Sequence, residues 1–100
     1  MITEKQRPVA LITGASRGIG AAIAEIFAAK GYDLVLGYRS GKDAIAGVKA
    51  SCEAIDKDIR IHTVMADVAL EEDCKKLFAE TKETFGRIDV LVNNAGQTKD

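Results

Sequence analysis

The chain has 100 residues, of which 47% are hydrophobic and 29% are charged, and its formal net charge is −1. This balance is typical of one soluble globular domain and excludes a general electrostatic attraction to nucleic acid or an anionic membrane. No apolar run approaches the roughly 20 residues of a membrane span. The charged residues 1–7 are not followed by a stretch of signal-peptide character. We therefore expect a cytoplasmic protein with no nucleic-acid or membrane partner.

The chain begins with a predicted strand and helix. An apolar run at residues 8–13 predicts a fully buried strand. A helical pattern follows over residues 18–30 and ends before Gly31, a typical C-terminal stop. The residues that recur at helical spacing predict its buried face: Ile19, Ala22, Ile23, Ile26 and Phe27.

A glycine-rich turn lies between this strand and this helix. Gly14, Gly18 and Gly20 have the spacing Gly-x-x-x-Gly-x-Gly, not the commoner Gly-x-Gly-x-x-Gly of dinucleotide sites. Glycines allow a tight turn and a close approach of the backbone to a ligand. The N–H groups and the positive dipole end of the helix then point at an anion. The turn therefore predicts a phosphate site, with a purely structural turn as the alternative.

Three more strand-like runs alternate with two more helical patterns. The strands are predicted at residues 34–38, 59–66 and 88–92. The second helix is expected to start at Ser40 as its N-cap and to bury Ile45, Val48, Cys52 and Ile55. The third helical face is closed by Gly86 and comprises Leu70, Cys74, Leu77, Phe78, Thr81 and Phe85.

This alternation predicts an α/β fold with a Rossmann-type, doubly wound parallel sheet of strand order 3-2-1-4. The first two helices should cover one face of the sheet and the third helix part of the other. Four features fall at the carboxyl ends of the strands, where such folds bind ligands. They are residues 14–20, 38–40, Asp67 and 93–96. Their convergence favours a dinucleotide.

These motifs resemble those of the short-chain dehydrogenase/reductase family. The cofactor turn of that family is similar to residues 13–20, its adenine-side motif to Asp67-Val68, and its second motif to Asn93-Asn94-Ala95-Gly96. The resemblance implies that residues 1–100 form an NADP-binding Rossmann domain. The backbone would hold the pyrophosphate and adjacent ribose at Gly14, Ala15, Ser16, Arg17, Gly18, Ile19 and Gly20.

The resemblance also assigns roles at the other strand ends. Asp67 would accept a hydrogen bond from the adenine amino group, and Val68 would help to hold the ring. The nicotinamide-side ribose would be lined by Asn94, Ala95 and Gly96. Asn93 would tie the sheet together.

The residues after the second strand bear on the choice of cofactor. An NAD site places Asp or Glu about 20 residues past the glycines, to bind the ribose 2′-OH. Here Arg39 stands in that place and Ser40 follows, with Arg17 close enough in the turn to assist. A guanidinium attracts a 2′-phosphate through charge-assisted contacts. We therefore predict NADP(H), with a solvated loop arginine as the alternative.

The remaining reactive side chains suggest no catalytic or metal site. The family's catalytic Ser, Tyr and Lys follow the fourth strand, so none is assigned in this chain. Tyr38 and Lys42 match the Tyr-x-x-x-Lys spacing but not its helical context. His62 lies within a strand with no second His beside it, so a packing or solvent-facing role is favoured. Cys52 and Cys74 are expected to be reduced packing residues rather than a disulfide or ligand pair.

The chain is also similar to the 3-oxoacyl-[acyl-carrier-protein] reductases of fatty acid synthesis, over the glycine turn and residues 93–100. This implies NADPH-dependent reduction of a small-molecule or carrier-bound carbonyl by a homo-oligomer, usually a tetramer. We expect the chain to be the incomplete, cofactor-binding part of a longer reductase, a fragment without the catalytic half. Two alternatives stay open: a non-catalytic NADP(H)-binding module, and a structural remnant that associates with a full-length relative.

Overall fold

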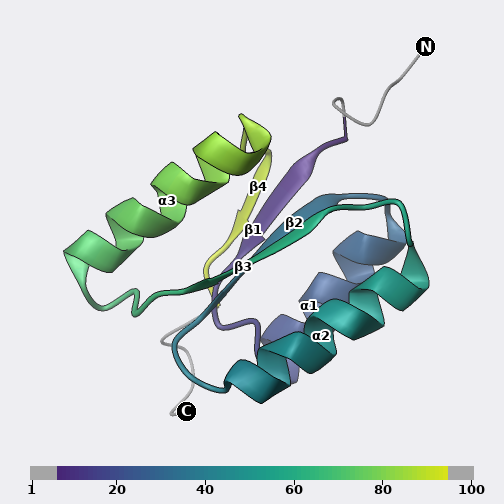
Figure 1. Cartoon of the computed structure of the whole chain (residues 1–100), viewed down its shortest axis with the longest axis horizontal. Helices are drawn as coiled ribbons and strands as arrows, with labels where there is room; N and C mark the ends of the chain where they lie inside the picture. Colours follow the sequence, from purple (N-terminus) through teal and green to yellow (C-terminus); the bar gives the residue numbers. More distant parts are fainter. Residues whose placement is uncertain (1–6, 95–100) are drawn as a thin grey trace.

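A computed structural model describes residues 7–94 of the chain. Strands and helices alternate throughout this part (Figure 1). In chain order they are β1 (Val9–Ile12), α1 (Gly18–Ala29), β2 (Asp33–Tyr38), α2 (Lys42–Ile55), β3 (Ile61–Met65), α3 (Glu71–Phe85) and β4 (Val90–Val92).

The four strands form one parallel sheet of order β3-β2-β1-β4, which confirms the predicted topology. Leu11 of β1 lies between Val35 of β2 and Leu91 of β4 in the register. Strands β1 and β4 are neighbours although most of the chain separates them. The turn after β1 and the turn after β4 therefore meet at one edge of the sheet.

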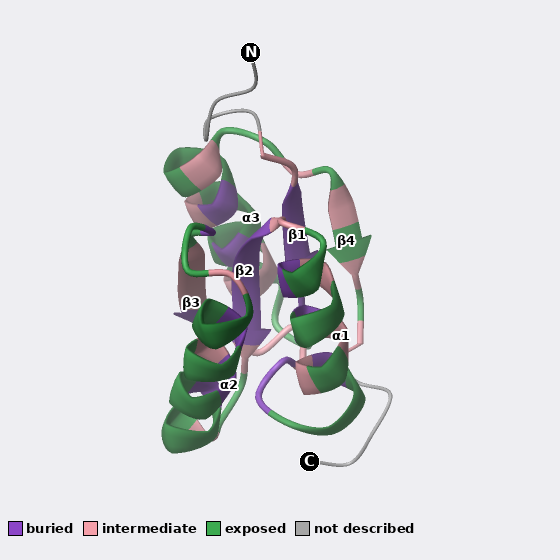
Figure 2. Ribbon diagram, turned by 90° about the vertical axis from the view of Figure 1, so that its right-hand side faces the viewer, coloured by how far each residue is buried: buried purple, intermediate pink, exposed green. Residues whose placement is uncertain are grey.

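The sheet separates two apolar layers, as expected from strands that read as continuous apolar runs. α1 and α2 cover one face and α3 lies on the other (Figure 1). Ile12 and Leu34 point toward α1 and α2, while Leu11 and Val35 point toward α3. β1 and most of β2 are buried, whereas β4 is only half covered (Figure 2).

The buried face of α1 differs from the predicted one. Its buried residues are Gly20, Ala24 and Ala28, whereas Ile19 and Ile26 are 65% and 54% exposed. The observed set of small residues and the predicted set of large residues both recur at helical spacing. Hydrophobicity alone favoured the larger residues for the buried face. The small residues face the sheet because they allow the helix axis to come close to β1. Ile23 and Phe27 are half-buried and pack against the core, so the predicted face of α1 was right for these two residues. It was wrong for the exposed Ile19, Ala22 and Ile26.

The start of α2 also differs from the prediction. The N-cap is Gly41, not Ser40, and it adopts a left-handed conformation with φ of 85°. No side chain caps this helix end. The face of α2 is otherwise as predicted, with Ile45, Val48 and Cys52 buried, although Ile55 is 45% exposed.

Two polar links hold β3 in place. Asp33 is fully buried, and its carboxylate accepts hydrogen bonds from the Arg60 guanidinium at 2.7 Å and from the Arg60 backbone N–H at 2.8 Å. His62 Nε2 lies 3.0 Å from Glu80 Oε1, so the histidine joins β3 to α3. This is a structural role of the kind expected for His62.

Both cysteines are free thiols. Burial, followed by the nearby carboxylates of Glu25 and Glu53, raises the pKa of Cys52 to about 11. Residues 7–94 contain no group of three or more His, Cys, Asp or Glu side chains placed to hold a metal ion. No helix in this part of the chain is long and apolar enough to cross a membrane.

Candidate cofactor site

The glycine turn joins the end of β1 to the start of α1. Gly14 and Gly18 have φ values of 61° and 62°, in the left-handed region that residues with a Cβ seldom adopt. These two positions let the chain reverse within a few residues. α1 then starts at Gly18, the second glycine of the turn.

Gly20 is required for a different reason, namely close approach. A Cβ at this position would lie 2.1 Å from the Gly14 carbonyl oxygen and 2.8 Å from Asn94 Nδ2. Neither neighbour is free to withdraw, since one is backbone and the other is hydrogen bonded to it. The first turn of α1 therefore packs against the glycine turn with no room for a side chain.

Hydrogen bonds fix the glycine turn to both neighbouring strand ends. The Ala15 N–H donates to the Gly37 carbonyl of β2 at 3.0 Å. On the other side, Asn94 Nδ2 donates to the Gly14 carbonyl at 3.1 Å. The turn thus has its position set by β2 and by the segment after β4, before any ligand binds.

Thr13 connects the same segments. Its N–H donates to the Val92 carbonyl at 3.0 Å, and its hydroxyl donates to Asn93 Oδ1 at 3.3 Å. The hydroxyl also accepts from the Asn94 N–H at 2.9 Å. This is the sheet-tying role expected of Asn93, but Asn94 shares it through both its backbone and its side chain.

The N-terminus of α1 is electrostatically suited to an anion. Arg17 is its N-cap, no side chain caps the helix end, and the first turn carries no acidic residue. Ser16 is only 9% exposed, and its hydroxyl takes part in none of the hydrogen bonds among residues 7–94. Backbone donors, a helix dipole and a buried hydroxyl are the groups that bind phosphate oxygens. The residues present therefore fit the pyrophosphate of a dinucleotide.

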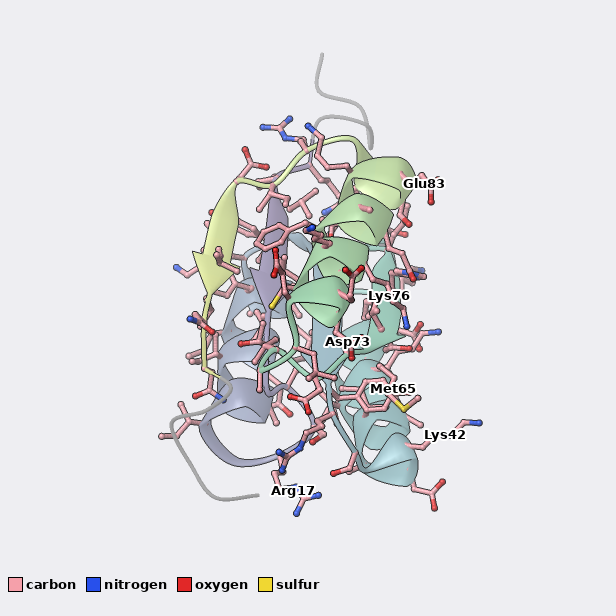
Figure 3. All side chains as sticks on the ribbon, turned by 90° about the vertical axis from the view of Figure 1, so that its left-hand side faces the viewer. Arg17, Lys42, Met65, Asp73, Lys76 and Glu83 are labelled. Carbon is pink, nitrogen blue, oxygen red and sulfur yellow. The ribbon has the colours of Figure 1, made fainter. Side chains whose placement is uncertain are left out.

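Arg17 reaches the loop between β2 and α2. Its Nη2 lies 3.2 Å from the position that a Cβ on Gly41 would occupy, and Ser16 Oγ lies 3.7 Å from it. Arg39 and Ser40 are exposed residues of that same loop. Figure 3 shows Arg17 at the end of the molecule where α1 and α2 begin. The structure thus brings the predicted cationic residues to one region.

Asp67 lies after β3 and already has a structural role. Its Oδ1 accepts from the Ala69 N–H at 3.0 Å, and its own N–H donates to Asp73 Oδ2 at 2.8 Å. The neighbouring Val68 carbonyl accepts from Cys74 Sγ at 3.2 Å. These bonds hold the loop in a fixed shape. The predicted contact of Asp67 with an adenine amino group stays a prediction.

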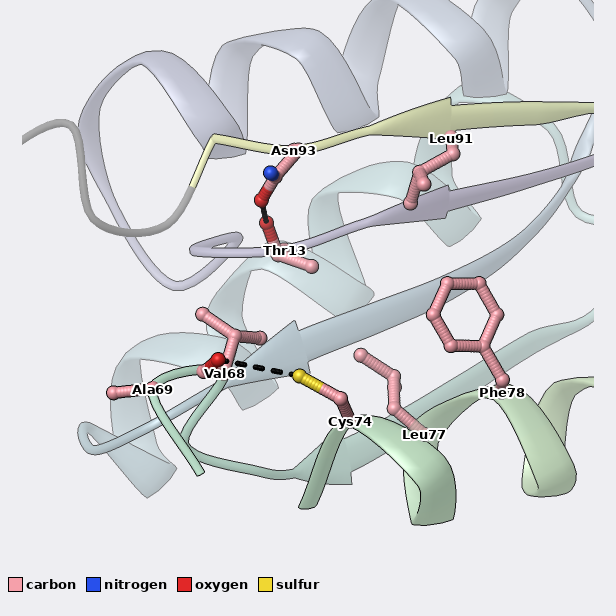
Figure 4. Close-up of a pocket in the computed structure, with 8 residues that line it drawn as sticks. All are labelled: Thr13, Val68, Ala69, Cys74, Leu77, Phe78, Leu91 and Asn93. Carbon is pink, nitrogen blue, oxygen red and sulfur yellow. Dashed lines mark hydrogen bonds between the residues drawn. The ribbon is translucent and has the colours of Figure 1, made fainter. Parts of the chain in front are cut away.

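A cavity of about 390 Å³ lies on the α3 face of the sheet (Figure 4). Its lining includes the exposed apolar side chains of Phe78 and Leu91, at 39% and 49% exposure. Val68 also lines it, together with Thr13 and Asn93 of the network that holds the glycine turn. The cavity therefore adjoins the glycine turn and extends over the α3 face of the sheet.

Some predicted residues cannot be placed, and others were missed. Ala95 and Gly96 lie outside the described residues. Tyr38 ends β2 and Lys42 begins α2, with Gly41 in a left-handed conformation between them, so the two do not share a helix. Gly37, whose carbonyl accepts from the Ala15 N–H, was not predicted to have a role. A glycine inside a strand pattern indicates a close backbone approach, and that signal was present.

Comparison with known proteins agrees with this geometry. A model of the short chain dehydrogenase family matches residues 8–100. The chain belongs to this family. This short-chain dehydrogenase is 43% identical to the 3-oxoacyl-[acyl-carrier-protein] reductase of Staphylococcus epidermidis over 91 residues. That match covers 91% of the chain but only 36% of the relative, so the chain spans little more than a third of the relative's length.

Solved structures of short-chain dehydrogenases also resemble the chain. One from Burkholderia xenovorans has a TM-score of 0.87 at 34% identity, over 94% of this chain and 38% of that one. The alcohol dehydrogenase of Thermococcus sibiricus, solved with 5-hydroxy-NADP, has a TM-score of 0.77 at 36% identity, over 86% and 36%. The carveol dehydrogenase of Mycobacterium avium, solved with NAD, has a TM-score of 0.82 at 29% identity, over 94% and 38%.

Proposed function

We propose that this chain is the NADP(H)-binding part of a carbonyl reductase of the short-chain dehydrogenase family. One observation carries the proposal. The loop after β2 offers Arg39 where an NAD site needs a carboxylate, and Arg17 extends from the glycine turn to that loop. A 2′-phosphate is a dianion near neutral pH, and two guanidinium groups in one region favour it over a 2′-hydroxyl.

The cofactors of similar proteins are mixed, so the preference must come from this chain's own residues. The Thermococcus enzyme binds an NADP derivative and the Mycobacterium enzyme binds NAD. An acidic residue after β2 would repel a 2′-phosphate. The chain has Arg39-Ser40-Gly41-Lys42 there, and the nearest acid is Asp43 inside α2. This charge balance supports NADP(H).

When bound, NADPH would supply the hydride for reduction of a carbonyl carbon. The residues of this chain would hold and orient the cofactor. The α1 N-terminus and Ser16 bind the pyrophosphate, Arg17 and Arg39 bind the 2′-phosphate, and Asn94 positions the ribose beside the turn that it anchors. The proton for the product oxygen comes from the family's Tyr, which follows the fourth strand in that family.

The relatives suggest the substrate. The Staphylococcus enzyme is a 3-oxoacyl-[acyl-carrier-protein] reductase, and we propose a 3-oxoacyl thioester on a carrier protein as the carbonyl substrate. The protein would then serve fatty acid synthesis in the cytoplasm, where its thiols stay reduced. Homo-oligomeric assembly, as in its family, completes the proposal.

The test compares NADPH and NADH affinities before and after Arg39→Asp, by nucleotide fluorescence. NADPH should bind more tightly to the unsubstituted protein. The substitution should weaken NADPH by roughly tenfold or more, with NADH unchanged or improved. Arg87→Asp, in the loop before β4 and so at the opposite end of the parallel strands from the Arg39 loop, controls for net charge. An unchanged NADPH-to-NADH ratio in Arg39→Asp would sink the proposal.

A further inference from the structure

We propose that Gly41 is a specificity-positioning residue: its missing side chain makes the space in which the Arg17 guanidinium lies against the start of α2, ready for the 2′-phosphate. This inference rests on the proposed NADP(H) function. It adds a determinant outside the glycine turn and outside the charged pair Arg17 and Arg39. Gly41 acts through Arg17 and makes no charged contact itself.

The geometry at Gly41 gives it two independent reasons to be glycine. Its φ of 85° lies in the left-handed region. In addition, a Cβ would stand 3.2 Å from Arg17 Nη2, 3.5 Å from the Ala44 Cβ and 3.7 Å from Ser16 Oγ. Most real Cβ atoms keep a larger distance than the first of these. Of the three neighbours, Arg17 is the flexible one, so Arg17 would move.

The electrostatics at this position favour an anion. Arg17 lies beside the N-terminus of α2, which carries the positive end of the helix dipole, has no capping side chain and has Asp43 as the acidic residue of its first turn. No carboxylate pairs with Arg17 among residues 7–94. A guanidinium and a helix N-terminus repel each other unless a negative group lies between them. A 2′-phosphate bonded to both would remove that repulsion.

The contact joins the two halves of the proposed site. Ser16 and Arg17 belong to the turn that starts α1, while Gly41 belongs to the loop that starts α2. Because Gly41 has no side chain, the two helix starts approach each other with Arg17 between them. A side chain at position 41 would push the guanidinium outward, away from the dipole end and toward solvent, where screening weakens it.

The experiment measures dissociation constants for NADPH and NADH with the purified protein and its variants. Gly41→Ala should weaken NADPH about three- to tenfold and change NADH less than about twofold. Gly41→Asn should do the same, and asparagine tolerates a positive φ better than alanine. Circular dichroism and urea unfolding report whether each variant is folded.

Gly86→Ala is the matched control. Gly86 ends α3 with φ of 78°, and nothing lies within 4 Å of where its Cβ would be. The substitution brings the same backbone strain without touching the site, so the NADPH-to-NADH ratio should not change. Arg17→Ala should lower that ratio, and adding Gly41→Ala to it should have no further effect.

The outcomes separate this inference from the proposed function. NADPH preference that survives in both Gly41→Ala and Gly41→Asn would overturn the role of Gly41 and leave the proposed function intact. An equal loss of ratio in Gly86→Ala, or an additive loss in the double variant, would also overturn it. Failure of the unsubstituted protein to prefer NADPH would instead overturn the proposed function itself.

Discussion

Asn94 Nδ2 donates a hydrogen bond to the Gly14 carbonyl oxygen at 3.1 Å, and so joins the segment after β4 to the turn after β1. These residues are 80 positions apart in the chain. They lie close together at the predicted site because β1 and β4 are neighbours in the sheet.

Loss of this bond should loosen the glycine turn. We expect Asn94→Ala to lower the free energy of unfolding by about 1 kcal/mol, since the Gly14 carbonyl loses a half-buried partner. Nucleotide binding should weaken with it, and urea unfolding with a parallel titration measures both. Asn93→Ala is the comparison, because Asn93 contributes a longer bond of 3.3 Å to Thr13. A larger effect at position 93 than at 94 would contradict this account of the turn.

Gly20→Ala should be far more damaging than its chemistry suggests. The added methyl would lie 2.1 Å from the Gly14 carbonyl oxygen, so either α1 or the turn must shift. Overpacking of this kind costs about 1–3 kcal/mol. Gly47→Ala is the matched control on α2, where a Cβ meets nothing within 4 Å. That variant should gain about 0.5–1 kcal/mol. Equal stability of the two variants in thermal unfolding would disprove the close approach.

The Asp33–Arg60 pair should dominate the ionic contribution to stability. Arg60→Ala removes the guanidinium from a fully buried carboxylate and leaves it only the backbone N–H of residue 60. Uncompensated buried charges cost about 3–5 kcal/mol, although Arg60 is itself half exposed and the low end of that range applies. The exposed Arg87–Asp89 pair provides the comparison, and loss of Arg87 should cost much less stability because solvent screens its charge. A lower urea midpoint for Arg87→Ala than for Arg60→Ala would contradict the dominant role of the Asp33–Arg60 pair.

Cys52 should make the protein sensitive to alkaline pH. Its folded pKa is raised to about 11 from an ordinary value of 9.0 by burial and by Glu25 and Glu53. Its contribution to stability is thus complete below pH 9 and is lost as pH rises toward 11, because the unfolded thiol ionises first. We expect Cys52→Ala to remove this component, seen in unfolding curves recorded between pH 8 and 11.

The two thiols should also differ in reactivity at pH 8, where the thiolate fraction and the accessibility of the sulfur control the alkylation rate. Cys74 is half-buried and Cys52 is fully buried. Alkylation followed by peptide mapping should label Cys74 in the native protein and Cys52 only after unfolding. Labelling of Cys52 first would show that the core beneath α2 opens more readily than its packing indicates.

The sequence predicted the fold well because each element carried a strong local signal. The strands read as apolar runs, and Gly31 and Gly86 marked the ends of α1 and α3 with positive φ values. Strand order was predicted from the alternation of strands and helices, the handedness of the connections and the order usual in doubly wound folds.

Other features depended on distances that a sequence does not contain. Hydrophobicity placed Ile19 and Ile26 in the core of α1, whereas close approach to β1 selected Gly20, Ala24 and Ala28. Ser40 has the better capping side chain, yet α2 starts after Gly41, whose left-handed conformation the sequence pattern did not indicate. The sequence indicated Thr13 only as the first residue of the glycine-turn motif. Its hydrogen bonds to residues 92–94 form because β1 pairs with β4, so the sequence pattern did not predict them.

If the glycine turn and the β2–α2 loop together form an NADP(H) site, the unsubstituted protein should bind NADPH saturably in a calorimetric titration. It should bind NADPH more tightly than NADH by roughly tenfold, a difference of about 1.4 kcal/mol in binding free energy. Equal affinities, or no saturable binding of either nucleotide at millimolar concentration, would contradict this prediction.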